Sequence, residues 1–170
     1  MKASVWISAL TWLATVPTSA LEPADDARLD AVTERGRQVM PFDLEKTTHV
    51  FTKTALGGRQ RVLAKNPADG EQVQRIRAHL AQLAEALSRG DFSWPERIHG
   101  ADMPGLAALR GAQPGQIEYR YQALPDGAQI DYVTGDAGLI EAIHRYFEAQ
   151  LHDHARHALP GHEQHRIPEK

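Results

Sequence analysis

The chain has 170 residues, nine of them histidine and none of them cysteine, and 19 Lys plus Arg against 22 Asp plus Glu give a net charge of −3. This length predicts one globular domain. Without cysteine there are no disulfides, thiolate ligands or thiol nucleophiles, so a metal ion would have to be held by His, Asp, Glu or Met. The slightly acidic balance argues against binding to nucleic acid.

The first 20 residues predict an export signal. Lys2 precedes an apolar run from Val5 to Val16, and small residues at 18–20 would allow cleavage after Ala20. The run is shorter than the roughly 20 residues that cross a bilayer, so no membrane insertion is expected after cleavage. We therefore expect a periplasmic or secreted protein, a location that also suits a chain without cysteine.

The mature chain is predicted to form one α+β domain over residues 21–157. A short helix is expected over residues 24–38, where Asp25, Asp26 and Asp30 favour the positive end of a helix dipole. The last segment, 158–170, is polar and contains Pro, Gly and two histidines, which is typical of a flexible tail.

The first half of the domain, residues 47–89, predicts two strands and a helix. Residues 47–53 and 59–65 are rich in β-branched or alternating side chains about a Gly-Gly turn, which indicates a β-hairpin. Over residues 68–88 apolar side chains recur at spacings of three and four. This spacing predicts an amphipathic helix of about five turns.

The second half, residues 116–157, repeats this order after a connecting loop, 90–115. Residues 117–122 and 128–134 predict another hairpin, and Asp136 begins another amphipathic helix. Two such units suggest an internal duplication. We expect a four-stranded antiparallel sheet with both long helices on one face, and a short helix from Pro104 inside the loop.

Three histidines are the main candidates for a functional site. His49 lies in a predicted strand, His79 at the edge of the first helix's apolar stripe, and His99 in the connecting loop. If the loop packs over the hairpin, the three imidazoles meet and could bind copper or zinc. Met103 or Asp102 would supply a fourth ligand, with Met103 favouring copper and Asp102 favouring zinc. The alternative is that each histidine only packs or forms hydrogen bonds in the core.

Secondary candidates lie elsewhere in the chain. Asp91 could orient one of the three histidines by a hydrogen bond. His154 and His157 are three residues apart and could share a metal ion on one helical face. Pairs of this kind also arise by chance, so a role for the second pair is the weaker hypothesis.

Several segments spread over most of the mature chain carry a family resemblance. They are Thr48-His49-Val50-Phe51, Ile76-Arg77-Ala78-His79-Leu80, Gly90-Asp91-Phe92 and Ile98-His99-Gly100-Ala101-Asp102-Met103-Pro104-Gly105. In these segments the chain resembles a family of small exported bacterial proteins of unknown function, some of which carry the name aspartate carbamoyltransferase. The resemblance implies that His49, His79 and His99 belong to the family's recurring pattern. The chain is far shorter than a carbamoyltransferase catalytic subunit and lacks its Ser-Thr-Arg-Thr phosphate-binding run, which argues against that activity.

The expected function is binding of copper or zinc through the histidine cluster, without a nucleotide cofactor. The sequence has no Walker loop, Gly-x-Ser-x-Gly elbow, His-Glu-x-x-His motif or EF-hand loop. Two alternatives stay open. The same cluster could serve a small periplasmic enzyme acting on a small molecule, because imidazole titrates near neutral pH. The chain could also be an interaction module for an unidentified protein, with no site and with the three histidines far apart.

Overall fold

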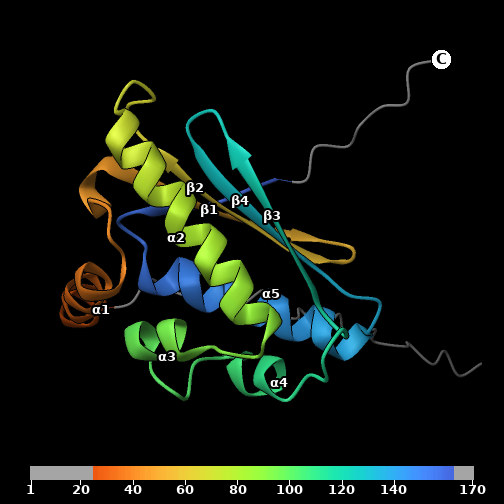
Figure 1. Ribbon diagram of the computed structural model, residues 1–170. Helices are drawn as coiled ribbons and strands as arrows, with labels where there is room; N and C mark the ends of the chain where they lie inside the picture. Colours follow the sequence, from red (N-terminus) through yellow and green to blue (C-terminus); the bar gives the residue numbers. More distant parts are fainter. Residues whose placement is uncertain (1–24, 163–170) are drawn as a thin grey trace, which may run out of the picture.

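The computed structural model describes residues 25–162 and has the predicted α+β architecture (Figure 1). The predicted signal peptide and the end of the predicted tail lie outside these residues. The described elements, in chain order, are α1 (Asp26–Val39), η1 (Leu44–Lys46), β1 (Thr47–Thr54), β2 (Gly57–Ala64), α2 (Gly70–Ser88), α3 (Ser93–His99), α4 (Leu106–Arg110), β3 (Glu118–Leu124), β4 (Gly127–Val133), α5 (Ala137–Asp153) and β5 (Ala158–Pro160).

Both predicted hairpins are present, and they pair with each other at the centre of the sheet. The strand order is β3-β4-β2-β1-β5, with antiparallel pairing of β1 with β2, β2 with β4 and β3 with β4. His49 lies opposite Val62 and Gln60 lies opposite Ile130. Because side chains alternate along a strand, these residues share one face, which is buried. The strand–strand–helix order recurs, and the internal duplication stays a prediction.

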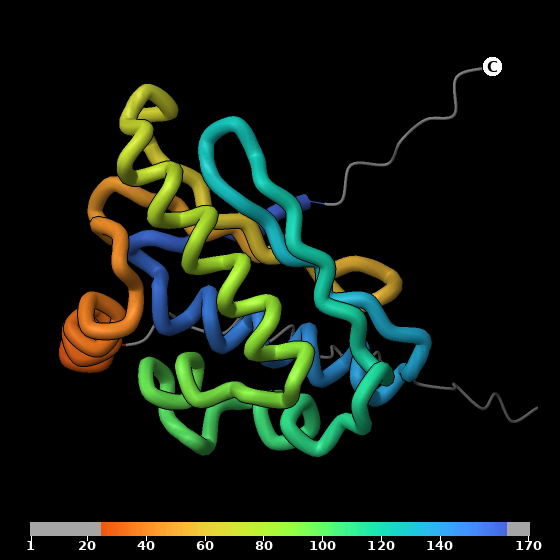
Figure 2. Tube along the Cα trace, viewed as in Figure 1, coloured from red at the N-terminus to blue at the C-terminus, as the bar shows by residue number. Residues whose placement is uncertain are grey.

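The sheet differs from the expected four antiparallel strands because a fifth strand joins it. β5 pairs in parallel with β1, and Ala158 lies opposite His49. The backbone N–H of Gly161 also donates to the carbonyl of Phe51 at 2.9 Å. A parallel neighbour needs a long crossover connection, and here α5 carries the chain back to the edge of β1 (Figure 2). Residues 158–160, expected in the tail, therefore belong to a mixed five-stranded sheet.

The two long helices cover the buried face of the sheet. α2 packs on β2, β3 and β4, whereas α5 packs on β1, β2 and β5 (Figure 1). Each of the two helices begins after an aspartate that caps it, since the carboxylates of Asp69 and Asp136 each accept a backbone N–H of the first turn. Phe147 of α5 lies directly on Gly58, where a Cβ atom would be only 2.4 Å from its ring. The glycine in β2 is thus required for close packing of α5.

The connecting segment is ordered and carries two short helices. α4 matches the short helix expected after Pro104, whereas α3 was not predicted. α3 contacts α1, and α4 packs alongside α5 (Figure 1). Within residues 25–162 no helix combines the length and hydropathy needed to cross a membrane. The segment's main consequence is the position of His99, the last residue of α3.

Candidate functional site

Four histidines line one small cavity of about 40 Å³ between the sheet, α2, α3 and the end of α5. They come from four different elements: His49 from β1, His79 from α2, His99 from the end of α3, and His154 from the residue after α5. Their exposed fractions are 3%, 7%, 3% and 5%. We call this space the histidine cavity. It has room for an ion or a few water molecules, but not for a substrate of many atoms.

Local structure explains why each imidazole points inward. His49 lies on the inner face of β1 together with buried Thr47 and Phe51, because every second side chain of a strand points to the same face. His79 lies one turn of helix after Ile76 and four residues before Leu83, on the buried side of α2. These two positions follow directly from the strand and helix periods.

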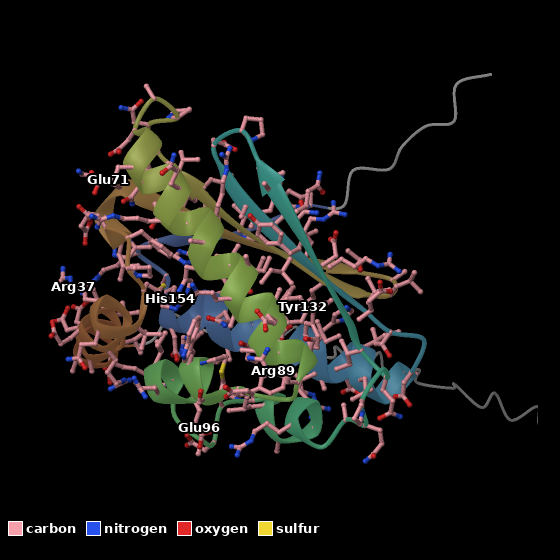
Figure 3. All side chains as sticks on the ribbon, viewed as in Figure 1. Arg37, Glu71, Arg89, Glu96, Tyr132 and His154 are labelled. Carbon is pink, nitrogen blue, oxygen red and sulfur yellow. The ribbon has the colours of Figure 1, made fainter. Side chains whose placement is uncertain are left out.

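The other two histidines are held where a helix ends. His99 precedes Gly100, whose positive φ of 99° turns the chain away from α3. The carbonyl of His154 accepts N–H groups from His157 and Ala158, both at 2.7 Å, and this turn leads the chain into β5. Figure 3 shows His154 in the interior, whereas Arg37, Glu71 and Glu96 lie at the periphery.

Three of the rings, those of His49, His99 and His154, lie close together. The ring centroid of His154 lies 4.9 Å from that of His99, with the planes at 90°, and 5.5 Å from that of His49, with the planes at 7°. His79 lies on another wall, where it stacks on Trp94 with centroids 4.9 Å apart and meets the edge of Phe42 at 5.5 Å. His49, His99 and His154 are therefore the closest set of nitrogen donors.

A buried carboxylate fixes the orientation of His99. Nδ1 of His99 lies 2.8 Å from Oδ2 of Asp153, so His99 donates its Nδ1 proton to this carboxylate and Nε2 points to the other side of the ring. Arg28 of α1 holds the same carboxylate with two bonds, Nε to Oδ1 at 2.7 Å and Nη2 to Oδ2 at 2.8 Å. His152 adds a contact to Oδ1 at 3.2 Å. Although burial alone would raise the Asp153 pKa, these bonds together hold it below its usual range.

Burial favours the neutral form of three imidazoles of the cavity, those of His49, His79 and His154. Loss of solvent lowers the pKa of His49 to about 3 and that of His79 to about 4. The pKa of His154 also lies well below its usual value, first because of burial and then because His99 and His49 are close. Within the described residues, Nδ1 of His49 is buried without a hydrogen-bond partner. Neutral imidazoles with free lone pairs are the form that binds metal ions.

The distances between the rings are compatible with one shared ion, but the orientation of two of the rings is not. Since zinc lies about 2.0 Å from an imidazole nitrogen, two rings on one tetrahedral ion have centroids roughly 5 Å apart. The 4.9 and 5.5 Å separations around His154 match this spacing. A bound ion also lies near each ring plane, so the nearly parallel rings of His49 and His154 would have to rotate. Accordingly, residues 25–162 contain no group of three His, Asp or Glu side chains already arranged around an ion.

Other candidates from the sequence lie outside the histidine cavity. Asp102 and Met103 border a separate surface hollow, together with Arg28, His152 and Asp153. Met103 is buried because its side chain packs into the apolar core. The Asp153–His99 pair forms the wall between this hollow and the histidine cavity.

The two remaining candidates have local roles. Asp91 is exposed and accepts the backbone N–H of Ser93 at 2.9 Å, and hydrogen bonds from the side chain and then the backbone of Ser93 lower the Asp91 pKa. His157 does not line the histidine cavity and places Nε2 3.3 Å from Oε1 of Glu45. Because α5 ends at Asp153, the two histidines do not share one helical face.

Several residues of the site were not proposed as site residues from the sequence. Asp153 is one acid among many, and only the folded chain shows that it meets His99 and Arg28. Gln60, which accepts from the Tyr132 hydroxyl at 2.8 Å, lines the cavity, as does Met40. A sequence signal existed for Asp153 in the His-Asp-His run at the end of an amphipathic helix.

Comparisons of this chain with protein-family models, with curated proteins and with solved structures give no match, so the functional argument rests on the geometry of the histidine cavity.

Proposed function

We propose that this protein binds one copper or zinc ion in the histidine cavity, through His49, His99 and His154, with His79 as a fourth donor on the opposite wall. The observation that supports this most directly is the convergence of four buried imidazoles from four elements on a space of about 40 Å³. An isolated buried histidine normally satisfies both ring nitrogens within the protein. His49 leaves Nδ1 without a partner among the described residues.

The hydrogen bond from His99 to Asp153 supports the same proposal. Histidine ligands commonly donate their second ring N–H to a carboxylate, which sets the tautomer and increases the basicity of the ligating nitrogen. Here Asp153 is itself held by Arg28 in a bidentate pair. The cavity therefore has one histidine, His99, whose orientation is fixed from outside by Asp153 and Arg28.

Metal binding to the purified protein tests the proposal. Elemental analysis and calorimetry with Zn(II) and Cu(I) should give one ion per chain, and a His49→Leu/His154→Leu variant should lose this stoichiometric binding. A matched control, His144→Gln/His162→Gln, removes two histidines that lie outside the cavity and should keep this binding. Equal binding by both double variants, with circular dichroism showing that both are folded, would contradict the proposal.

The chain should end no earlier than residue 162 in these measurements. A chain ending at His157 would lack β5, which pairs with the strand that carries His49. Loss of binding in such a chain would reflect an incomplete sheet rather than a missing ligand.

A metal-free acid–base enzyme is the second candidate, favoured by the buried His99–Asp153 hydrogen bond. In that case Nε2 of His99 would accept a proton from a small substrate, with Asp153 stabilising the imidazolium. The histidine cavity would then retain no stoichiometric metal, and Asp153→Asn would abolish turnover without changing metal content. The small volume of the cavity limits such a substrate to a few atoms.

Export is part of the proposal and rests on the N-terminal sequence alone. Cleavage after Ala20 would give a mature protein beginning at Leu21, which mass spectrometry of the exported protein can check. In an extracytoplasmic compartment, one ion per chain would suit a buffer, carrier or sensor.

A further inference from the structure

The wall of the histidine cavity contains one sulfur donor, Met40. This residue follows α1, is 7% exposed and lines the cavity with the histidines. Its terminal methyl group packs over Gly36, where a Cβ atom would lie 2.8 Å from Met40 Cε. The end of the Met40 side chain thus packs against α1, and the residue forms part of the cavity wall.

The charge of the cavity wall favours an ion of low charge. Among the described residues, the lining contains imidazoles, a thioether, amides and a phenol, but no Asp or Glu. The nearest carboxylate identified, Asp153, is neutralised by its bidentate pair with Arg28. The cost of burying an ion grows with the square of its charge, so a divalent ion pays roughly four times the desolvation cost of a monovalent one.

The donor types lead to the same choice. Thioether sulfur is a soft ligand that selects Cu(I), whereas imidazole accepts copper and zinc alike. A neutral wall with several imidazoles and one thioether therefore discriminates against Zn(II) through both charge and softness. On the basis of the metal-binding function proposed above, we propose that the bound ion is Cu(I) and that the sulfur of Met40 is one of its ligands.

The test compares Met40→Leu with Met103→Leu under anaerobic conditions. Both substitutions replace a buried methionine by an apolar residue of similar volume, but Met103 lies outside the histidine cavity. Cu(I) affinity is measured by competition with a chromophoric chelator, and Zn(II) affinity by calorimetry. Met40→Leu should weaken Cu(I) binding at least about tenfold and leave Zn(II) binding unchanged, whereas Met103→Leu should change neither.

X-ray absorption at the copper edge gives an independent readout. The Cu(I)-loaded wild type should show one sulfur scatterer besides nitrogen, and Met40→Leu should show nitrogen alone. If the wild type binds an ion but Met40→Leu keeps full Cu(I) affinity and the same spectrum, the assignment of Met40 is overturned while the metal site stands. If the wild type binds neither ion, the proposed function fails and this inference fails with it.

Discussion

The neutral, buried imidazoles predict a steep loss of stability in mild acid. Burial lowers the pKa of His49 to about 3 and that of His79 to about 4, whereas an unfolded histidine has a pKa near 6.5. Above pH 6.5 these residues are neutral in both states and do not affect the stability. As the pH falls below 6.5, the unfolded chain takes up protons that the folded protein excludes, so the free energy of unfolding falls until the pH reaches the folded pKa.

The size of this effect follows from the pKa differences. Each pKa unit corresponds to about 1.4 kcal/mol, so lowering the pH from 7.5 to 5 should cost about 2 kcal/mol for each of His49 and His79. His154, whose pKa also lies well below its usual value, acts in the same direction. The loss of about 4 kcal/mol from His49 and His79 together is a large part of the roughly 5–15 kcal/mol that stabilise a typical domain.

Urea unfolding of the metal-free protein in chelator, at several pH values between 7.5 and 5, measures this loss. Between pH 6 and 5 the slope should correspond to uptake of about two protons on unfolding by His49 and His79, and His154 acts in the same direction. In His79→Phe, which keeps a ring between Trp94 and Phe42, the slope should fall by one proton. Equal slopes for the wild type and His79→Phe would refute the claim that His79 is buried in its neutral form.

Three further predictions concern stability at neutral pH. Asp153→Asn breaks the pair with Arg28, which is partly exposed, and should lower the free energy of unfolding by about 2 kcal/mol in urea denaturation. Gly58→Ala puts a methyl group into the ring of Phe147 and should cost about 2 kcal/mol in the same assay. A chain ending at residue 157 lacks β5 and should melt several degrees below a chain ending at residue 162, as followed by circular dichroism.

Matched controls separate these causes from general sensitivity to mutation. Glu148→Gln removes a carboxylate whose ion pair with Lys53 is exposed, and it should cost less than about 0.5 kcal/mol. Gly70→Ala adds a methyl group where no atom of the described residues lies within 4 Å, and it should be neutral or slightly stabilising. If these control variants lose as much free energy of unfolding as Asp153→Asn and Gly58→Ala, then the Asp153–Arg28 pair and the contact with Phe147 do not explain the losses in those two variants.

Local periodicity predicted most of the fold, because both hairpins and both long helices bury one continuous face. β5 could not be predicted in this way, since three residues ending in Pro160 show no alternation, and their pairing depends on where α5 returns the chain. α3 was missed for a related reason. Its sequence, Ser93–His99, is short and contains Pro95, so its helical conformation reflects packing against α1.

The histidine site was predicted only in part for the same physical reason. The inward direction of His49 and His79 follows from strand and helix periods. The partners of His99 depend on tertiary packing, which brings Asp153 and His154 from the far end of the chain. Met103 was considered as a ligand because it is near His99 in sequence, but its side chain packs into the core beside a different hollow.

The hydrogen-bonded ion pair between Arg28 and Asp153 joins positions that are 125 residues apart in the sequence. Closing so long a loop costs conformational entropy that is repaid only when many distant contacts form together. A chain without residues 153–160 lacks Asp153, His154 and β5, and therefore cannot complete the histidine cavity. If the cavity binds an ion as proposed, the ion can be loaded only after these residues have been added to the fold, and its release depends on how often the C-terminal segment detaches from β1.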